Sequence, residues 1–97
     1  MLQLRDMSAM IEEIIRGELG TGRVEAVRVT EEFGYDEEKV LRVFVVYRDK
    51  ASRFEASEML RTLTAVRRHL RDQDIANSAM LSYIPKSEAQ WLEAGAK

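Results

Sequence analysis

The side chains that could perform acid–base or metal chemistry are few in this sequence of 97 residues. The single histidine, His69, lies among arginines, whose positive charge disfavours a protonated imidazole and repels a metal ion. Many carboxylates occur as adjacent pairs such as Glu31 and Glu32, and adjacent residues of a helix or strand point in different directions. Because acid–base catalysis and metal binding need converging groups, we expect no catalytic residue, no metal site and no cofactor.

Nucleophilic and phosphate-binding motifs are also missing. The sequence contains no cysteine, and its serines have no histidine partner. Gly20-Thr21-Gly22 follows an expected helix instead of preceding one, and it lacks the lysine of a phosphate-binding loop. We therefore expect the protein not to be an enzyme.

Arginines form the second group of residues with a functional interpretation. Four of them fall close together: Arg61, Arg67, Arg68 and Arg71. Such a cluster is a modest footprint for nucleic-acid phosphates, and the alternative is a solvated helix face. The net charge of -2 favours neither interpretation.

The spacing of apolar residues predicts the elements that carry these side chains. Apolar residues three and four apart predict a helix over 4–19, which Gly20 and Gly22 end. Alternating patterns predict strands over 23–32 and 40–48, joined by a hairpin loop, and a third strand over 79–85. Between them, Ser52 and Glu55 have the spacing of a capping box for a second helix, which ends in the polar residues 72–77.

The order helix-strand-strand-helix-strand predicts an α+β, two-layer domain. We expect a three-stranded mixed sheet, in which the crossover through the second helix makes the third strand parallel to a neighbour, with both helices on one face. The chain should form a single domain over 1–97, with its core at about 3–85. The segment 86–97 is expected to be a short helix or frayed.

The strand over 40–48 is apolar on both faces, although two helices can cover only one face of the sheet. One face carries Leu41, Val43, Val45 and Tyr47, and the other carries Val40, Phe44 and Val46. The second set, or its counterpart on the opposite face, must be covered by the C-terminal segment with Trp91 and Leu92, or by another chain. Val40, Phe44 and Val46 are therefore the candidate partner-binding residues, for another small protein or for a homodimer.

The sequence carries no targeting signal that we can identify. No apolar run approaches the roughly 18 to 20 residues that span a bilayer, and residues 1–6 lack the pattern of a signal peptide. The absence of cysteine fits a reducing compartment. We expect a cytoplasmic protein without membrane contact.

Three segments together resemble a group of small bacterial proteins: 40–47, the helix over 59–70, and 81–89, which reads Leu-Ser-Tyr-Ile-Pro-Lys-Ser-Glu-Ala. That group has an acidic hairpin turn, a leucine-rich helix with arginines and a closing run of the form S-F/Y-I-x-K-S-E-A. Its members tend to be encoded beside a small helical protein of HEPN type, in an arrangement similar to toxin–antitoxin pairs. The resemblance covers about residues 23–89 and implies a binding subunit that neutralises a helical partner.

A second resemblance joins the segments 10–19 and 27–31 to the start of ribosome-binding factor A, a type II KH-like domain with the same element order. It implies an RNA-binding function in ribosome assembly, for which the four arginines would contact phosphates. However, Thr64-Ala65-Val66 offers no glycine where that family's second helix is normally kinked. We therefore place protein binding first, RNA binding second, and a scaffold that dimerises through its sheet third.

Overall fold

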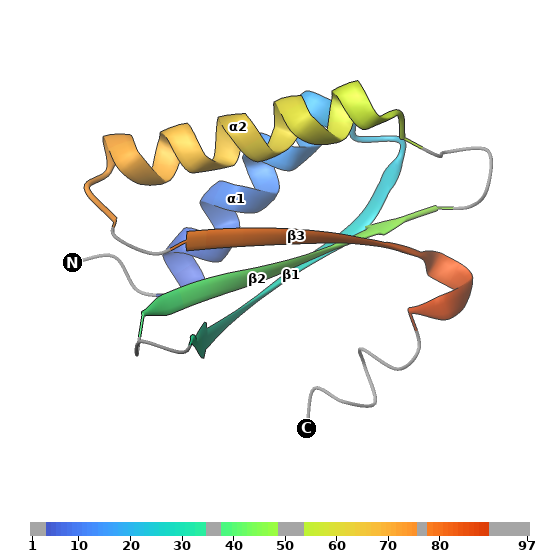
Figure 1. Ribbon diagram of the computed structural model, residues 1–97. Coiled ribbons are helices and arrows are strands. Elements are labelled where there is room, and N and C mark those ends of the chain that lie inside the picture. Colours follow the sequence, from blue (N-terminus) through green and yellow to red (C-terminus); the bar gives the residue numbers. More distant parts are fainter. Residues whose placement is uncertain (1–3, 35–37, 49–53, 76–77, 90–97) are drawn as a thin grey trace.

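The computed structural model contains two long helices and three strands in the predicted order (Figure 1). The elements are α1 (Leu4–Leu19), β1 (Val24–Phe33), β2 (Lys39–Tyr47), α2 (Ala56–Asp72) and β3 (Ser78–Pro85), followed by the short 3-10 helix η2 (Lys86–Glu88). The structure describes residues 4–34, 38–48, 54–75 and 78–89. The helix predicted over 4–19 is confirmed. β1 and β2 differ from their predicted bounds by one residue at each end, and β3 begins one residue earlier than predicted.

The strands form one mixed sheet in the order β1-β2-β3. β1 pairs antiparallel with β2, as in a hairpin, and β3 pairs parallel with β2. Val43 marks the middle of the sheet, where it pairs with Val29 of β1 and Leu81 of β3. The α+β fold class and the parallel placement of the third strand are therefore confirmed.

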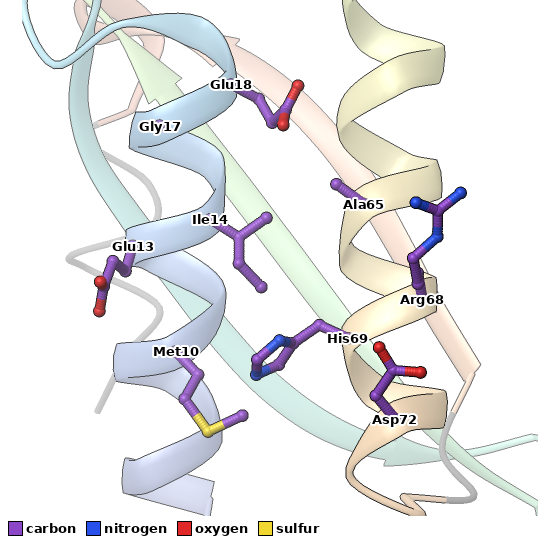
Figure 2. Close-up of a pocket in the computed structure, with 9 residues that line it drawn as sticks. All are labelled: Met10, Glu13, Ile14, Gly17, Glu18, Ala65, Arg68, His69 and Asp72. Atoms are coloured by element: carbon purple, nitrogen blue, oxygen red, sulfur yellow. The ribbon is translucent and has the colours of Figure 1, made fainter.

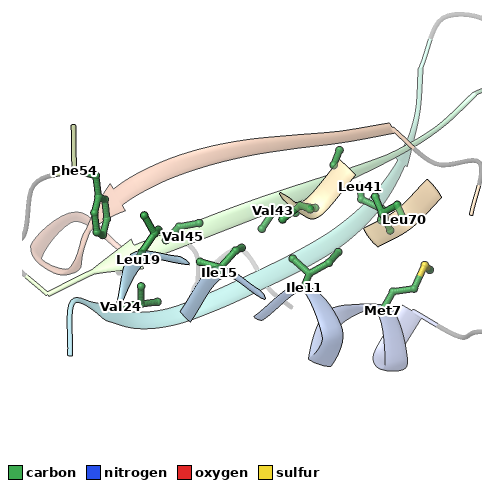
Figure 3. Packing of buried hydrophobic residues seen from close by; sticks show 12 residues of the cluster. Met7, Ile11, Ile15, Leu19, Val24, Leu41, Val43, Val45, Phe54 and Leu70 are labelled. Atoms are coloured by element: carbon green, nitrogen blue, oxygen red, sulfur yellow. The ribbon is translucent and has the colours of Figure 1, made fainter. Parts of the chain in front are cut away.

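Both helices pack on the same face of this sheet (Figure 1). α1 buries one residue per turn, at Met7, Ile11, Ile15 and Leu19. These side chains meet the β2 residues that the alternation placed on one face, Leu41, Val43 and Val45, together with Val66 and Leu70 of α2 (Figure 3). The two layers thus enclose one apolar core, whose burial from water is the main force that holds the helices on the sheet.

α1 ends where the sequence places a glycine. Gly20 has a φ of 97°, a conformation that glycine adopts without steric cost, and its N–H donates to the carbonyl oxygen of Arg16 at 2.9 Å. The chain then turns directly into Val24, which is fully buried at the start of β1.

The start of α2 corrects one prediction. The helix begins at Ala56, and its capping box joins Glu55 to Glu58 instead of Ser52 to Glu55. The backbone N–H of Glu55 donates to Oε1 of Glu58 at 2.9 Å. Glu58 is also the ion-pair partner of Arg23, so a tertiary contact fixes the first turn here. Ser52 lies outside the described residues, as do Trp91 and Leu92, the predicted cover of the second sheet face.

Candidate functional site

The side of the sheet away from the helices carries the three predicted partner-binding residues. Val40, Phe44 and Val46 alternate along β2 with the residues that face the helices, because successive side chains of a strand point to opposite sides. Cross-strand pairing places further residues on the same side: Ala26, Arg28, Thr30 and Glu32 of β1, and Met80, Ser82 and Ile84 of β3. We call these ten residues and Arg42 the outer sheet face.

Accessibility differs sharply among the residues of the outer sheet face. Val40 and Phe44 are half-buried, whereas Val46 is only 4% exposed and offers almost no surface to a partner. Met80, four residues before Ile84 on the same side of β3, is 55% exposed. The strand predicted over 79–85 contains Met80 and Ile84, which alternation sets on one face. Sequence reasoning did not select them, because the register that sets Met80 opposite Arg42 of β2 has no local signal.

Charged groups border the apolar part of the outer sheet face. The guanidinium carbon of Arg42 lies 5.3 Å from the centroid of the Phe44 ring, within the range of a cation–π contact. Nε of Arg42 is 3.9 Å from Oε2 of Glu32. An apolar centre with a polar rim of both signs is the usual composition of a protein-binding surface.

The four arginines proposed for nucleic acid all lie on α2, but they do not form a single patch. Arg61 and Arg68 line depressions on the side of α2 toward α1. Arg67 and Arg71 line another, beside Ser78 at the start of β3. Nε of Arg61 is also 3.5 Å from Oε1 of Glu18. The division of the cluster and this acidic neighbour weaken the case for a continuous track of phosphate contacts.

A groove of about 550 Å³ separates α1 from α2 on the outer surface of the helix layer (Figure 2). Met10, Ile14 and Ala65 form its apolar part, and charged residues from both helices border it. His69 is half-buried here, and its ring extends from α2 toward α1 (Figure 2). Among the described residues, no group of three or more acidic, histidine or cysteine side chains could hold a metal ion.

A partly buried cluster of Arg23, Phe54 and Glu58 joins the helix layer to one end of the sheet. Nη1 of Arg23 is 2.7 Å from Oε2 of Glu58, and Nη2 is 3.2 Å from Oε1, so the pair is bidentate. The same guanidinium lies 4.4 Å above the ring of Phe54. The hydrogen bond from Arg23, helped by that from the Glu55 backbone, lowers the pKa of Glu58 to about 2. The two side chains pair with each other. We call Arg23, Phe54 and Glu58 the clasp, because they join the segment before β1 to the start of α2.

Tyr83 is the polar exception on the helix-facing side of the sheet. Its ring packs 5.6 Å from that of Phe54. Its buried hydroxyl lies near Thr62 but has no partner at hydrogen-bonding geometry among the described residues. Thr62 itself is fully buried and donates to the carbonyl oxygen of Glu58 at 2.8 Å. Burial raises the pKa of Tyr83, which favours the neutral phenol over a reactive phenolate.

Within the described part of the chain, neither helix combines the length and the apolar character needed to cross a bilayer. Comparison of the chain with protein-family models, with curated proteins and with solved structures gave no match in any of the three.

Proposed function

We propose that this protein is a non-enzymatic binding subunit that holds another protein against its outer sheet face. The observation that carries the proposal is the unequal covering of the sheet. Two helices bury one face, while the other face leaves Phe44 and Val40 half-buried and Met80 more than half exposed, although Val46 is covered. Contiguous apolar surface of this kind marks an interaction site.

The chemistry of the outer sheet face indicates the kind of partner. Phe44 and Met80 supply apolar contact area, and methionine adapts its shape to an irregular partner surface. Arg28 and Arg42 add cations beside this apolar area. A partner helix with an apolar stripe and acidic residues along one border would match these features. Together with the resemblance to proteins encoded beside a helical neighbour, this supports an antitoxin-like role, in which binding neutralises the partner.

The first experiment identifies the partner and locates its binding surface. The tagged protein is purified from its native cells, and any protein that co-purifies at near-equal stoichiometry is expressed and tested against the purified chain by calorimetry. We expect Phe44→Asp and Met80→Asp each to weaken binding by about 2 kcal/mol or more, because each puts a charge into an apolar contact. Leu60→Asp is the matched control, since Leu60 is 66% exposed on the helix layer, away from the sheet.

The outcome of this experiment separates the proposal from its alternative. Full binding by Phe44→Asp and Met80→Asp would exclude the outer sheet face. Recovery of RNA with ribosomal proteins, lost steeply as salt rises, would instead support the nucleic-acid interpretation through the α2 arginines. The neutralising role has its own test. Expression of the partner alone should arrest growth, co-expression of the wild-type chain should restore it, and Phe44→Asp should fail to restore it.

A further inference from the structure

We infer that the outer surface of the helix layer binds a second copy of this chain, with α1 of each copy lying over α2 of the other. This surface is on the opposite side of the molecule from the outer sheet face, so the inference stands independently of the proposed function. It rests on the shape of the groove between the helices and on the distribution of charge across it.

The groove has the shape of a docking site for protein. Ile14 and Ala65 form its middle, and Gly17 on the rim leaves open space where a side chain would otherwise stand. A second depression of about 430 Å³ continues from it along α2 and is bordered by Leu60. Leu60 is 66% exposed, which is a high value for a leucine inside a helix. Exposed apolar side chains such as these are stabilised when another surface covers them.

The two helices carry opposite charge. α1 has four acidic residues against two basic ones, and α2 has four basic residues against two acidic ones, with His69 counted as neutral. At the groove, Glu13 and Glu18 come from α1, and α2 contributes Arg61 and Arg68 together with one acid, Asp72 near its end. Glu18 and Arg61 already approach each other within the chain at 3.5 Å. Glu13 and Arg68 form no ion pair with another described residue, so they remain available to a second molecule.

A surface with one acidic and one basic side is complementary to itself under one particular symmetry. A two-fold axis that runs along the groove turns the second copy over and places its α1 above α2 of the first copy. Glu13 and Arg68 lie at about the same level on opposite sides of the groove (Figure 2), so this rotation brings each Glu13 to Arg68 of the other copy. A two-fold axis across the groove would instead place acidic α1 over acidic α1, which repulsion disfavours.

The size of this surface predicts weak association. A helix of 16 residues is about 24 Å long and two adjacent helices are about 20 Å wide. Each copy would therefore bury about 500 Å², or about 1,000 Å² in total, the lower end for a specific interface. We expect a dimer that forms at micromolar or higher concentration and that dissociates as salt screens the charges.

Sedimentation of the purified chain at increasing concentration, from about 10 µM to about 1 mM, measures this equilibrium directly. We expect Glu13→Arg and Arg68→Glu each to weaken dimerisation about tenfold or more, because symmetry makes each like-charge contact occur twice. Combining both changes in one chain should restore most of the affinity, since the charges are exchanged but remain complementary. Both residues are exposed, so thermal unfolding should show that all these variants stay folded.

A mixing experiment separates a symmetric dimer from other causes of association. Glu13→Arg chains and Arg68→Glu chains, each monomeric alone, should form a one-to-one heterodimer when mixed, because every contact then joins opposite charges. Phe44→Asp should leave the dimer intact, since Phe44 lies on the other side of the molecule. A chain that stays monomeric at every concentration, or a dimer indifferent to both charge reversals, would overturn the inference.

Discussion

The strand β2 carries large apolar residues on both of its faces, yet the two sets stand in very different surroundings. On the helix side of β2, Leu41, Val43 and Val45 are at most 1% exposed. On the other side of the same strand, Val40 and Phe44 remain half-buried, and Met80 of β3 is 55% exposed. One set of side chains of this strand therefore stabilises the fold, and the other set includes the residues that we propose for association.

This difference makes exposure, and not hydrophobicity, the property that separates stabilising residues from binding residues. Burial of apolar surface stabilises the fold only where the side chain leaves water during folding. Apolar groups left in contact with water contribute when a partner covers them. Substitutions on the two faces should consequently affect different measurements, namely stability for one face and binding for the other.

The largest effect should come from a pair of neighbouring residues that point to opposite faces. Leu41→Ala should destabilise the protein by about 2 to 5 kcal/mol, because it leaves a cavity in the core where Leu41 is 0% exposed. Val40→Ala should cost below about 1 kcal/mol. Urea denaturation of the two variants checks both values. Equal costs would show that the outer sheet face is a core surface like the inner one.

The next effect concerns the clasp that closes the helix-covered side at one end. The pKa of Glu58 is lowered to about 2 in the folded chain, from an ordinary value of 4.5. The ionised carboxyl therefore stabilises the fold above about pH 4.5, and this contribution is lost as the pH falls from 4.5 toward 2. Chemical denaturation between pH 4.5 and about pH 2 should show that the wild type loses stability as the pH falls, and that Glu58→Gln lacks this loss.

A companion variant shows whether the ion pair, and not the glutamate alone, causes this pH dependence. Arg23→Gln removes the hydrogen bonds at 2.7 and 3.2 Å and leaves the carboxyl in place. It should also lack most of this acid-dependent loss of stability, because Arg23 is the largest cause of the lowered pKa of Glu58. A full acid response in Arg23→Gln would place the cause in the capping box instead.

A smaller effect, this time a gain in stability, is expected from a substitution on the outer surface of α1. Gly17 is exposed within the helix, and a Cβ there would meet nothing within 4 Å. Gly17→Ala should stabilise the fold by about 0.5 to 1 kcal/mol, because alanine loses less backbone freedom in a helix than glycine does. Gly20→Ala is the matched comparison and should be destabilising, since Gly20 has a φ of 97°. Thermal unfolding measures both changes in stability. A destabilising Gly17→Ala or a stabilising Gly20→Ala would contradict the prediction.

The periodicity of apolar residues was sufficient to predict the element order and the two faces of β2, but not which of these faces the helices cover. These features depend on local patterns, such as the four-residue spacing from Met7 to Leu19 and the alternation from Val40 to Tyr47. The start of α2 was misplaced because Glu58 is fixed by Arg23, 35 residues away in the chain. No local pattern contains that contact.

The candidate surfaces were harder to predict for the same physical reason. Val40, Phe44 and Val46 were correctly placed on one side, but the burial of Val46 and the exposure of Met80 depend on packing between strands. The arginines were correctly grouped on one helix, yet the tertiary arrangement divides them between the α1 side and the β3 side of α2. The groove itself involves residues about 50 positions apart, such as Ile14 and Ala65.

The smallest expected effect tests a buried polar group on the helix-covered side. The hydroxyl of Tyr83 is buried without a hydrogen-bonding partner among the described residues. Tyr83→Phe should therefore leave stability at pH 7 unchanged or raise it by up to about 0.5 kcal/mol, whereas removing a hydrogen-bonded hydroxyl usually costs about 1 kcal/mol. Chemical denaturation at neutral pH distinguishes these results.

The same variant should differ from the wild type at alkaline pH. Burial raises the pKa of Tyr83 above the ordinary value of 10.0, so above that value the unfolded chain gives up its phenolic proton more readily than the folded chain does. The wild type should then lose stability as the pH rises through this range, and Tyr83→Phe should lack this component. A clear loss of stability in Tyr83→Phe at pH 7 would mean that the hydroxyl does have a partner, with Thr62 the nearest candidate. The helix-covered side would then be stabilised by a polar contact as well as by apolar packing.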